Sequence, residues 1–201
     1  MIIGLTGNIG SGKSTVSRRL AQLGAEVVDT DLVSRDAVAP GTWGLKRITD
    51  EFGPGVLNEN GELDRAKMAA IVFENPGARK TLESIIHPEV IRVVGQRIEE
   101  YRRGLGSAPA LVVEVPLLIE AGMDKMMDQI WVVTVDREVQ VERVMSRSGL
   151  SREDVLGRIN AQMSQEEKRK YAHRIIDNSG HLEDTVRQVD AIWSEITAKT
   201  E

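Results

Sequence analysis

The sequence contains no cysteine, only three histidines and few aromatic residues, which make up 3% of the chain. Without cysteine there is neither a disulfide framework nor a thiolate metal site. The histidines are scattered and form no H-E-x-x-H pattern or comparable cluster. We therefore expect any bound metal ion to be held by oxygen atoms.

Long hydrophobic runs and an excess of positive charge are also lacking. No run approaches the 18 apolar residues of a membrane span, and the first residues form a strand pattern without a basic targeting region. The formal net charge is -5, which argues against a general nucleic-acid or membrane-surface binder. We expect small-molecule partners, no nucleic acid, no membrane, a cytoplasmic location, and a monomer or weak homo-oligomer.

The length and composition suit a folded enzyme-sized domain. The chain has 201 residues, of which 41% are hydrophobic. This is enough to bury a sizeable core, so we expect one domain with insertions.

The most informative segment is Gly7–Ser14, which reads GNIGSGKS and fits the phosphate-binding pattern G-x-x-x-x-G-K-[ST]. The apolar residues 1–6 before it predict a buried strand, and residues 14–23 after it predict a helix that Gly24 ends. In this context the glycines let successive backbone N–H groups face one anion. The lysine supplies charge for the β and γ phosphates, and the serine hydroxyl is a ligand for Mg²⁺. The sequence thus predicts one nucleoside triphosphate site with Mg²⁺.

A second short strand, residues 25–28, delivers two acids to its carboxyl end, where open parallel sheets place their ligands. Asp29 is either a functional group or the N-cap of the helix that follows. Asp31 is the stronger functional candidate, because Arg35 lies four residues later on the same helical face. The alternative for this pair is an exposed ion pair. We expect the end of this strand to lie beside the phosphate loop.

Residues 43–106 are too long for an ordinary connection between strands, and their apolar spacing is mostly helical. They predict an inserted substrate subdomain. Pro88 should interrupt the helical pattern, so that two helices meet at His87. His87 is either a capping residue or a ligand contact.

The third strand, residues 110–115, carries Glu114 where P-loop enzymes place a carboxylate near Mg²⁺. Residues 116–120 should open another helix. Leu117 and Leu118 in this segment are candidates either for the core or for a substrate-contacting wall.

A fourth strand at 129–135, a fifth at 174–177 and an amphipathic closing helix ending near Ile196 complete the pattern. Alternation of strands and helices predicts an α/β fold with a five-stranded parallel sheet flanked by helices.

The stretch between the fourth and fifth strands has no strand pattern and is rich in arginine. Most of these side chains should be solvated. Arg143 and Arg147 share a helical face, which suggests that they clamp a transferring phosphate. With Gly149 and the polar segment after it, residues 148–171 predict a mobile lid.

Taken in order, several short motifs resemble dephospho-CoA kinase over nearly the whole chain. They are T-G-x-I-G-S-G-K-S-T, Asp29-x-Asp31-x-x-x-Arg35, His87-Pro88, Pro116-Leu117-Leu118-x-Glu120, Gln140-x-x-Arg143-x-x-x-Arg147 and Asn178-x-Gly180. Each motif after the phosphate loop is weak alone, but their order and spacing together are specific. The resemblance implies ATP-dependent phosphorylation of the ribose 3′-hydroxyl of dephospho-CoA, the last step of coenzyme A synthesis.

The resemblance also implies residue roles. ATP would be bound by Gly10, Ser11, Gly12, Lys13, Ser14, Thr15, Arg143 and Asn178, the last of which would approach adenine. The acceptor would be bound by Asp31, Arg35, His87, Leu117 and Leu118. The catalytic groups would be Asp31, Lys13 and Arg147, and the Mg²⁺ ligands would be Ser14 and Glu114. The nucleotide-binding core would comprise residues 1–42, 107–147 and 172–201, with 43–106 on the CoA side and 148–171 as the lid.

Two departures from the family pattern concern the site. Asn8 stands where glycine is usual, which a positive backbone φ would permit because asparagine tolerates it best. Glu114 stands where aspartate is frequent, and its longer side chain leaves open whether it contacts the metal directly or through water.

Two other functions fit the phosphate loop. A GTP-dependent switch protein fits less well, because no asparagine is followed by lysine as the guanine-reading N-K-x-D motif requires. A kinase of another small acceptor, such as a nucleoside monophosphate, would share the core, the lid and the chemistry.

Overall fold

The computed structural model describes residues 1–198, which divide into two compact units. Among these residues, the first combines residues 1–28 with residues 98–198, and the second comprises residues 29–97.

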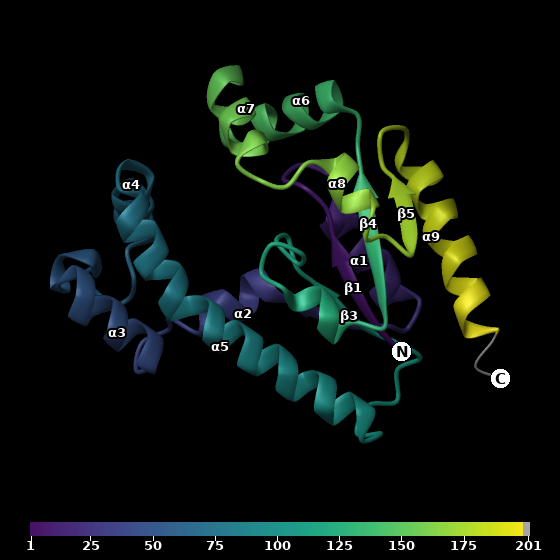
Figure 1. Ribbon diagram of the computed structural model, residues 1–201, viewed down its shortest axis with the longest axis horizontal. Coiled ribbons are helices and arrows are strands. Elements are labelled where there is room, and N and C mark those ends of the chain that lie inside the picture. Colours follow the sequence, from purple (N-terminus) through teal and green to yellow (C-terminus); the bar gives the residue numbers. More distant parts are fainter. Residues whose placement is uncertain (199–201) are drawn as a thin grey trace. The chain divides into compact units, whose positions relative to one another are not determined.

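The first unit is built on a five-stranded parallel sheet with the order β2-β3-β1-β4-β5, of which β1, β3, β4 and β5 are labelled in Figure 1. The strands are β1 Ile2–Thr6, β2 Glu26–Asp29, β3 Leu111–Glu114, β4 Gln129–Thr134 and β5 Arg174–Asp177. All five positions of β1 and all four of β3 are buried, as the apolar runs predicted for a sheet covered on both faces. The predicted α/β fold is confirmed.

The register of the central strands sets the position of the site. Leu5 of β1 is opposite Glu114 of β3, and Thr6 is opposite Val132 of β4. The phosphate loop therefore leaves the sheet directly beside the carboxyl end of β3.

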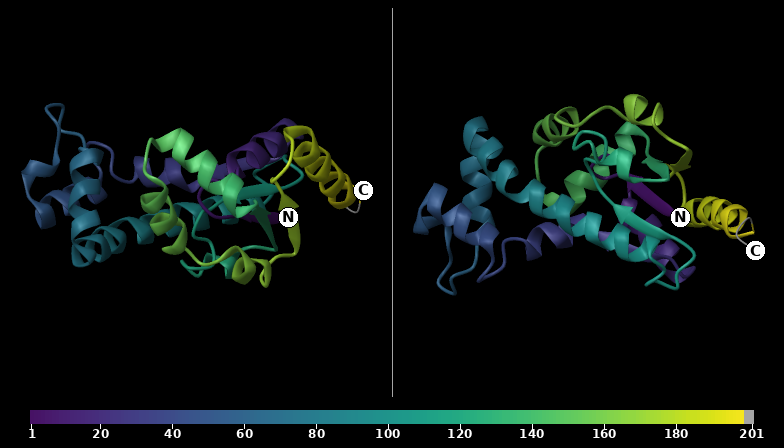
Figure 2. Two further views of the ribbon diagram at one scale, coloured as in Figure 1. Left: turned by 90° about the horizontal axis from the view of Figure 1, so that it is seen from above. Right: turned by 60° about the horizontal axis from the view of Figure 1, so that its bottom comes forward.

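Two helices, α1 Lys13–Gln22 and α9 Leu182–Thr197, run side by side along the sheet (Figure 2). Their apolar residues, including Val16, Leu20 and Val189, pack in the main core with Ile3 and Trp131. This packing buries the apolar face of each helix, which is the principal source of helix stability in proteins.

The remaining helical elements of the first unit follow β3 and β4. They are the short 3₁₀ helix η2 Met123–Met126, α6 Arg137–Ser148, α7 Arg152–Asn160 and α8 Gln165–Arg169. Val144 of α6 and Val155 of α7 belong to a separate apolar cluster that holds these two helices together. The predicted helical, strand-free stretch between β4 and β5 is confirmed.

The prediction of a helix opening at residues 116–120 is wrong. These residues form successive turns that end at Gly122, whose φ of 67° lies in the left-handed region. Leu118 of this segment is fully buried and packs against Gly4 of β1.

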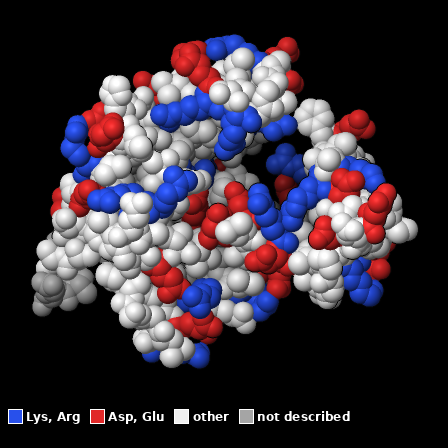
Figure 3. All heavy atoms as spheres, turned by 180° about the vertical axis from the view of Figure 1, so that it is seen from behind, with Lys and Arg blue, Asp and Glu red and all other residues white. Residues whose placement is uncertain are grey.

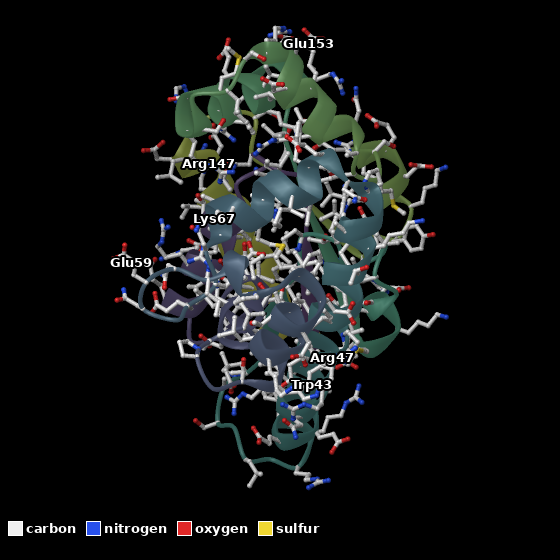
Figure 4. All side chains as sticks on the ribbon, turned by 90° about the vertical axis from the view of Figure 1, so that its left-hand side faces the viewer. Trp43, Arg47, Glu59, Lys67, Arg147 and Glu153 are labelled. Carbon is white, nitrogen blue, oxygen red and sulfur yellow. The ribbon has the colours of Figure 1, made fainter. Side chains whose placement is uncertain are left out.

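The second unit is helical. It contains α2 Thr30–Asp36, α3 Trp43–Phe52, the 3₁₀ helix η1 Pro54–Val56, α4 Arg65–Glu74 and most of α5 Pro76–Arg102, whose last turn belongs to the first unit. Its core is formed by Val38, Ile48, Val56, Met68 and Ile85. On α3 the exposed Trp43 ring is covered by the guanidinium of Arg47, 5.7 Å from the ring centre (Figure 4). The helical character of residues 43–97 agrees with the sequence, and the compact unit that contains them comprises residues 29–97.

The prediction that two helices meet at His87 is also wrong, because α5 continues through Pro88. Proline removes one backbone N–H and frees the carbonyl four residues earlier. Here that carbonyl belongs to Ser84, which is exposed, as is Pro88 itself. Water can therefore satisfy the freed carbonyl, while Ile85 and Val90 on the other face of the helix are buried.

Among residues 1–198, no helix is long and apolar enough to cross a membrane. On the face shown in Figure 3, acidic and basic side chains are interspersed rather than gathered into one large basic area.

Candidate nucleotide site

The phosphate loop lies between β1 and α1 and turns at two glycines. Gly10 has a φ of 76° and Gly12, the N-cap of α1, has a φ of 89°. A Cβ atom at Gly10 would lie 2.6 Å from Val144 Cγ2, and one at Gly12 would overlap the side-chain nitrogen of Asn178. Both positions therefore require glycine, for backbone conformation and for space.

The predicted phosphate ligands are brought together by this turn. Lys13 is the first residue of α1, and its Nζ donates hydrogen bonds to the carbonyls of Gly7 at 2.9 Å and Asn8 at 3.4 Å. Ser14 is exposed at the helix start, and Thr15 follows it, half-buried. The first turn of α1 contains no acidic residue, so the positive end of the helix dipole is available to an anion.

The two predicted Mg²⁺ ligands face each other. Oγ of Ser14 donates to Oε1 of Glu114 at 3.4 Å, and Glu114 is almost fully buried at the end of β3. Hydroxyl and carboxylate oxygens are the donors that Mg²⁺ prefers, and this ion usually keeps several waters and substrate oxygens. Within the described residues, no group of three or more His, Asp or Glu side chains could hold a metal. The Ser14 and Glu114 pair thus fits an ion that arrives with a nucleotide.

Asn8 was expected to have a positive backbone φ, but the structure shows a different reason for asparagine at this position. Among the described residues, only glycines have a positive φ, so Asn8 does not occupy the left-handed region. Its side chain is 2% exposed, and Nδ2 donates to the carbonyl of Met163 at 2.9 Å. Asparagine here joins the phosphate loop to the segment between α7 and α8.

Asn178 lies against the phosphate loop, at the turn after β5. Its Nδ2 donates to the carbonyl of Ser11 at 2.8 Å, and its Oδ1 accepts from the hydroxyl of Thr185 at 2.8 Å. Both atoms of the amide thus bond to protein groups, which gives Asn178 a role in holding the loop, and its contact with adenine stays a prediction.

Arg143 and Arg147 both lie on α6, one helical turn apart. Arg143 is half-buried, and Arg147 is exposed in the last turn before Gly149 ends the helix with a φ of 68° (Figure 4). The long, always charged Arg147 side chain is therefore free of packing constraints at the start of the predicted lid.

The two leucines after β3 differ in exposure. Leu118 is fully buried, which supports the core alternative for this residue, whereas Leu117 is half-exposed. Only Leu117 keeps a surface that a substrate could contact.

The remaining predicted site residues belong to the second unit. Asp29 is the N-cap of α2, accepting from the backbone N–H of Asp31 at 2.8 Å, so the capping alternative for Asp29 is confirmed. Asp31, in the first turn of α2, is exposed. Arg35 is exposed in the last turn of α2, and His87 is exposed within α5, where it caps no helix.

The sheet order corrects one expectation about Asp31. In the sheet, β3 lies between β2 and β1, so the end of β2 is not directly beside the phosphate loop. The carboxylate on the neighbouring strand is that of Glu114.

Sequence reasoning did not identify Gln162 and Gln140 as residues that hold the phosphate loop, and it assigned no role to Lys168. Oε1 of Gln162 accepts from the N–H of Ile9 at 2.8 Å, and Nε2 of Gln140 donates to its carbonyl at 2.6 Å. Lys168 is fully buried beside Glu120. Gln140 was visible in the motif with Arg143, whereas nothing in the polar sequence around Gln162 and Lys168 marks them.

A parallel sheet in this order, a glycine-rich loop capping the first helix and an arginine-bearing helix after β4 define a P-loop kinase. Comparison with known proteins supplies the family. The family model for CoaE, dephospho-CoA kinase, matches residues 1–184, and the chain belongs to this family.

Individual relatives agree with this assignment. The chain is 50% identical over 192 residues to a dephospho-CoA kinase of Symbiobacterium thermophilum, covering 96% of this chain and 80% of the relative. It is 47% identical over 195 residues to that of Geobacter metallireducens, covering 97% and 96% of the two chains. The structure of dephospho-CoA kinase from Campylobacter jejuni is 26% identical and superposes with a TM-score of 0.75, covering 100% of this chain and 98% of that one. Family membership decides for an ATP-dependent kinase over a GTP-dependent switch protein.

Proposed function

We propose that this protein transfers the γ-phosphoryl group of ATP to the ribose 3′-hydroxyl of dephospho-CoA, giving coenzyme A and ADP. The observation that carries the proposal is the phosphate loop between β1 and α1, in a chain that belongs to the dephospho-CoA kinase family. The proposal includes a cytoplasmic location and a monomer or weak homo-oligomer.

The nucleotide is held by the loop and by the start of α1. Backbone N–H groups of Gly10 through Thr15 surround the β and γ phosphates, and Lys13 exchanges its carbonyl contacts at Gly7 and Asn8 for phosphate oxygens. Ser14 and Glu114 would hold Mg²⁺, directly or through water. When bound, this ion neutralises charge on the β and γ phosphates.

Transfer breaks the bond between the γ-phosphorus and its bridging oxygen to the β-phosphate while the 3′-oxygen forms a new bond to the γ-phosphorus. The carboxylate of Asp31 orients the 3′-hydroxyl and accepts its proton. Arg143 and Arg147 bind the γ-phosphate and the developing charge. ADP leaves from the loop.

The acceptor is positioned by residues outside the phosphate loop. Arg35 and His87 are exposed polar groups of the second unit and would bind the acceptor's phosphates and ribose, with Leu117 contacting its apolar part. This assignment of the acceptor side rests on the family resemblance.

An acceptor screen tests the proposal. ADP formation is measured with purified protein, ATP and Mg²⁺ in the presence of dephospho-CoA, AMP, CMP or shikimate. We expect turnover with dephospho-CoA and with none of the other three acceptors. Loss of this turnover in Lys13→Ala would exclude a contaminating kinase as its source. Turnover with AMP or CMP and none with dephospho-CoA would establish the nucleoside monophosphate kinase alternative instead.

A further inference from the structure

Lys168 is a buried charge in a short helix whose other charged residues are exposed. Its side chain is 0% exposed, whereas its neighbours Glu167 and Arg169 in the five-residue helix α8 are exposed. Nζ lies 2.9 Å from Oε1 of Glu120, and it donates to the carbonyl of Pro116 at 2.9 Å. Burial lowers the pKa of Lys168, and the contact with Glu120 opposes that shift. A buried ion pair is weak evidence for stability, since apolar replacements are often as stable. This position therefore calls for another explanation.

Glu120 connects the pair to the phosphate loop. Its Oε1 accepts from the backbone N–H of Met163 at 3.1 Å, and the carbonyl of Met163 accepts from Nδ2 of Asn8 at 2.9 Å. The preceding side chain, Gln162, accepts from the N–H of Ile9. Two hydrogen bonds thus link the Glu120 carboxylate to the buried Asn8 side chain in the loop.

Pro116 connects the pair to the two central strands. Its carbonyl accepts from Nζ of Lys168 and from the hydroxyl of Thr6 at 3.2 Å. Thr6 is the last residue of β1, directly before the loop, and Pro116 lies two residues after Glu114. The Pro116 carbonyl, held by the Lys168 ammonium group, therefore joins both strand ends that carry the nucleotide site.

We propose that Lys168 and Glu120 are positioning residues for nucleotide binding, which fix the phosphate loop at Asn8 and the turn after Glu114 without touching the nucleotide. The inference rests on the proposed function, in which this loop binds the phosphates of ATP. Pre-set loop amides need no reorganisation when the phosphates arrive. A consequence is that Gln162 and Met163 stay fixed against the phosphate loop, and any closing movement of the predicted lid is confined to residues before 162.

The competing explanation is that the pair only attaches α8 to the sheet. However, α8 is already attached to the end of β4 by Gln165. Its Oε1 accepts from the N–H of Val135 at 2.8 Å, and its Nε2 donates to the carbonyl of Val135 at 2.9 Å. Gln165→Leu therefore removes an attachment of α8 and leaves the connections of Glu120 in place. Lys170→Met is the second control, because it makes the same change at an exposed lysine two residues away.

The experiment measures the binding of Mg·ATP by calorimetry in the absence of acceptor. Steady-state kinetics and the melting temperature are measured for the same variants. In Lys168→Met we expect Mg·ATP to bind at least about tenfold more weakly and kcat to fall. The reason is that misplacing the groups of a site by about 1 Å can lower the reaction rate by about 100-fold. Gln165→Leu should melt earlier with unchanged Mg·ATP affinity, and Lys170→Met should match the wild type.

Folded Lys168→Met that binds Mg·ATP as the wild type does would overturn the proposal, and so would an equal loss of affinity in Gln165→Leu. If Lys168→Met does not fold, Glu120→Gln decides, because this side chain is 24% exposed and glutamine keeps an acceptor for Met163. A loss of Mg·ATP affinity of about threefold or more supports the proposal, since one charge-assisted hydrogen bond is weakened, and a smaller loss contradicts it. Because ATP binding is read without acceptor, failure on dephospho-CoA in the acceptor screen would not be confused with this result.

Discussion

Asn178 donates a hydrogen bond from Nδ2 to the carbonyl oxygen of Ser11, 2.8 Å away, and so ties the turn after β5 to the phosphate loop. The bond is buried, and Oδ1 of the same amide accepts from the hydroxyl of Thr185 in the first turn of α9. Thr185 thereby fixes which way the amide points. Asn178 and Thr185 form a support for the loop at Ser11, separate from the one at Asn8.

This relationship predicts the effect of Thr185→Val, which keeps the shape of the side chain and removes the hydroxyl. Leaving Oδ1 of Asn178 without its donor should cost about 1 to 3 kcal/mol of folding stability. Affinity should fall by a similar factor for Mg·ATP and for magnesium tripolyphosphate, because the support acts on the phosphates. The measurements are thermal unfolding and calorimetric titration with each ligand.

Thr197→Val is the matched control, since the Thr197 hydroxyl donates only to carbonyls within α9. It should leave both affinities unchanged. If Thr185→Val weakened ATP but left tripolyphosphate binding intact, Asn178 would be a contact for adenine, as the family resemblance suggested.

A second prediction concerns the ion pair between α1 and α9. Nε and Nη2 of Arg19 lie 2.7 and 2.8 Å from the two carboxylate oxygens of Asp190. The hydrogen bonds from Arg19 lower the pKa of Asp190. A carboxyl group with a lowered pKa in the folded protein stabilises the fold fully above its ordinary pKa of about 4, and this contribution is lost as the pH falls through the folded value.

Asp190→Asn should therefore melt below the wild type at neutral pH, and the difference in Tm should shrink as the pH falls below about 4. Scanning calorimetry of both proteins between neutral pH and the acid limit of folding measures this. A Tm difference that stays constant over the whole range would mean that Asp190 contributes through packing rather than charge.

The parts of the structure that the sequence predicted well are those determined by local chemistry. The phosphate loop needs glycine at Gly10 and Gly12 for its own backbone, and β1 and β3 are apolar at nearly every position because both faces are covered. Such requirements appear directly in the residues. Side-chain contacts between distant segments do not, and Lys168 is the clearest case: a lysine in a polar segment indicates an exposed position unless its partner Glu120, 48 residues away, is known.

The two wrong helix predictions have the same origin. Pro88 was expected to break α5. The Ser84 carbonyl lacks its N–H donor there, but it is exposed and can accept a hydrogen bond from water, while the buried face of the helix stays continuous. The turn segment from Pro116 contains good helix formers, yet burial of Leu118 against Gly4 determines its path. In both cases tertiary packing outweighed local preference, and that packing is visible only in the folded chain.

Arg147→Lys provides a third prediction, about the clamp on the transferring phosphate. Arg147 is exposed at the end of α6, so the substitution should leave Tm unchanged within about 2 °C. Lysine keeps the charge but loses the planar fork that binds two phosphate oxygens at once, so turnover should fall strongly while Mg·ATP affinity is nearly retained. Steady-state kinetics and calorimetry separate the two quantities. Equal losses in turnover and affinity would show that Arg147 binds ATP in the ground state.

The last prediction concerns Asp31, which is exposed in the first turn of α2, where Asp29 is the capping residue. If Asp31 accepts the proton of the 3′-hydroxyl, then Asp31→Asn removes the acceptor but keeps the size of the side chain. The transition state of phosphoryl transfer is loose, so much of this residue's effect is orientation of the hydroxyl, and we expect turnover to fall roughly 10² to 10⁴-fold. Affinity for Mg·ATP should be retained.

The alternative role for Asp31 is a hydrogen bond to water on Mg²⁺, and it predicts a different result. Asp31→Asn would then weaken Mg·ATP binding, and raising the Mg²⁺ concentration would restore much of the rate. Turnover and Mg·ATP affinity of the variant, measured across a Mg²⁺ titration, distinguish the two roles. The sheet order makes this experiment necessary, because Glu114 on β3, and not Asp31 after β2, is the carboxylate on the strand next to the phosphate loop and already contacts Ser14. A metal role is therefore better supported for Glu114, and we expect the rate of Asp31→Asn to stay low at every Mg²⁺ concentration. Turnover close to the wild type at ordinary Mg²⁺ would exclude both roles for Asp31.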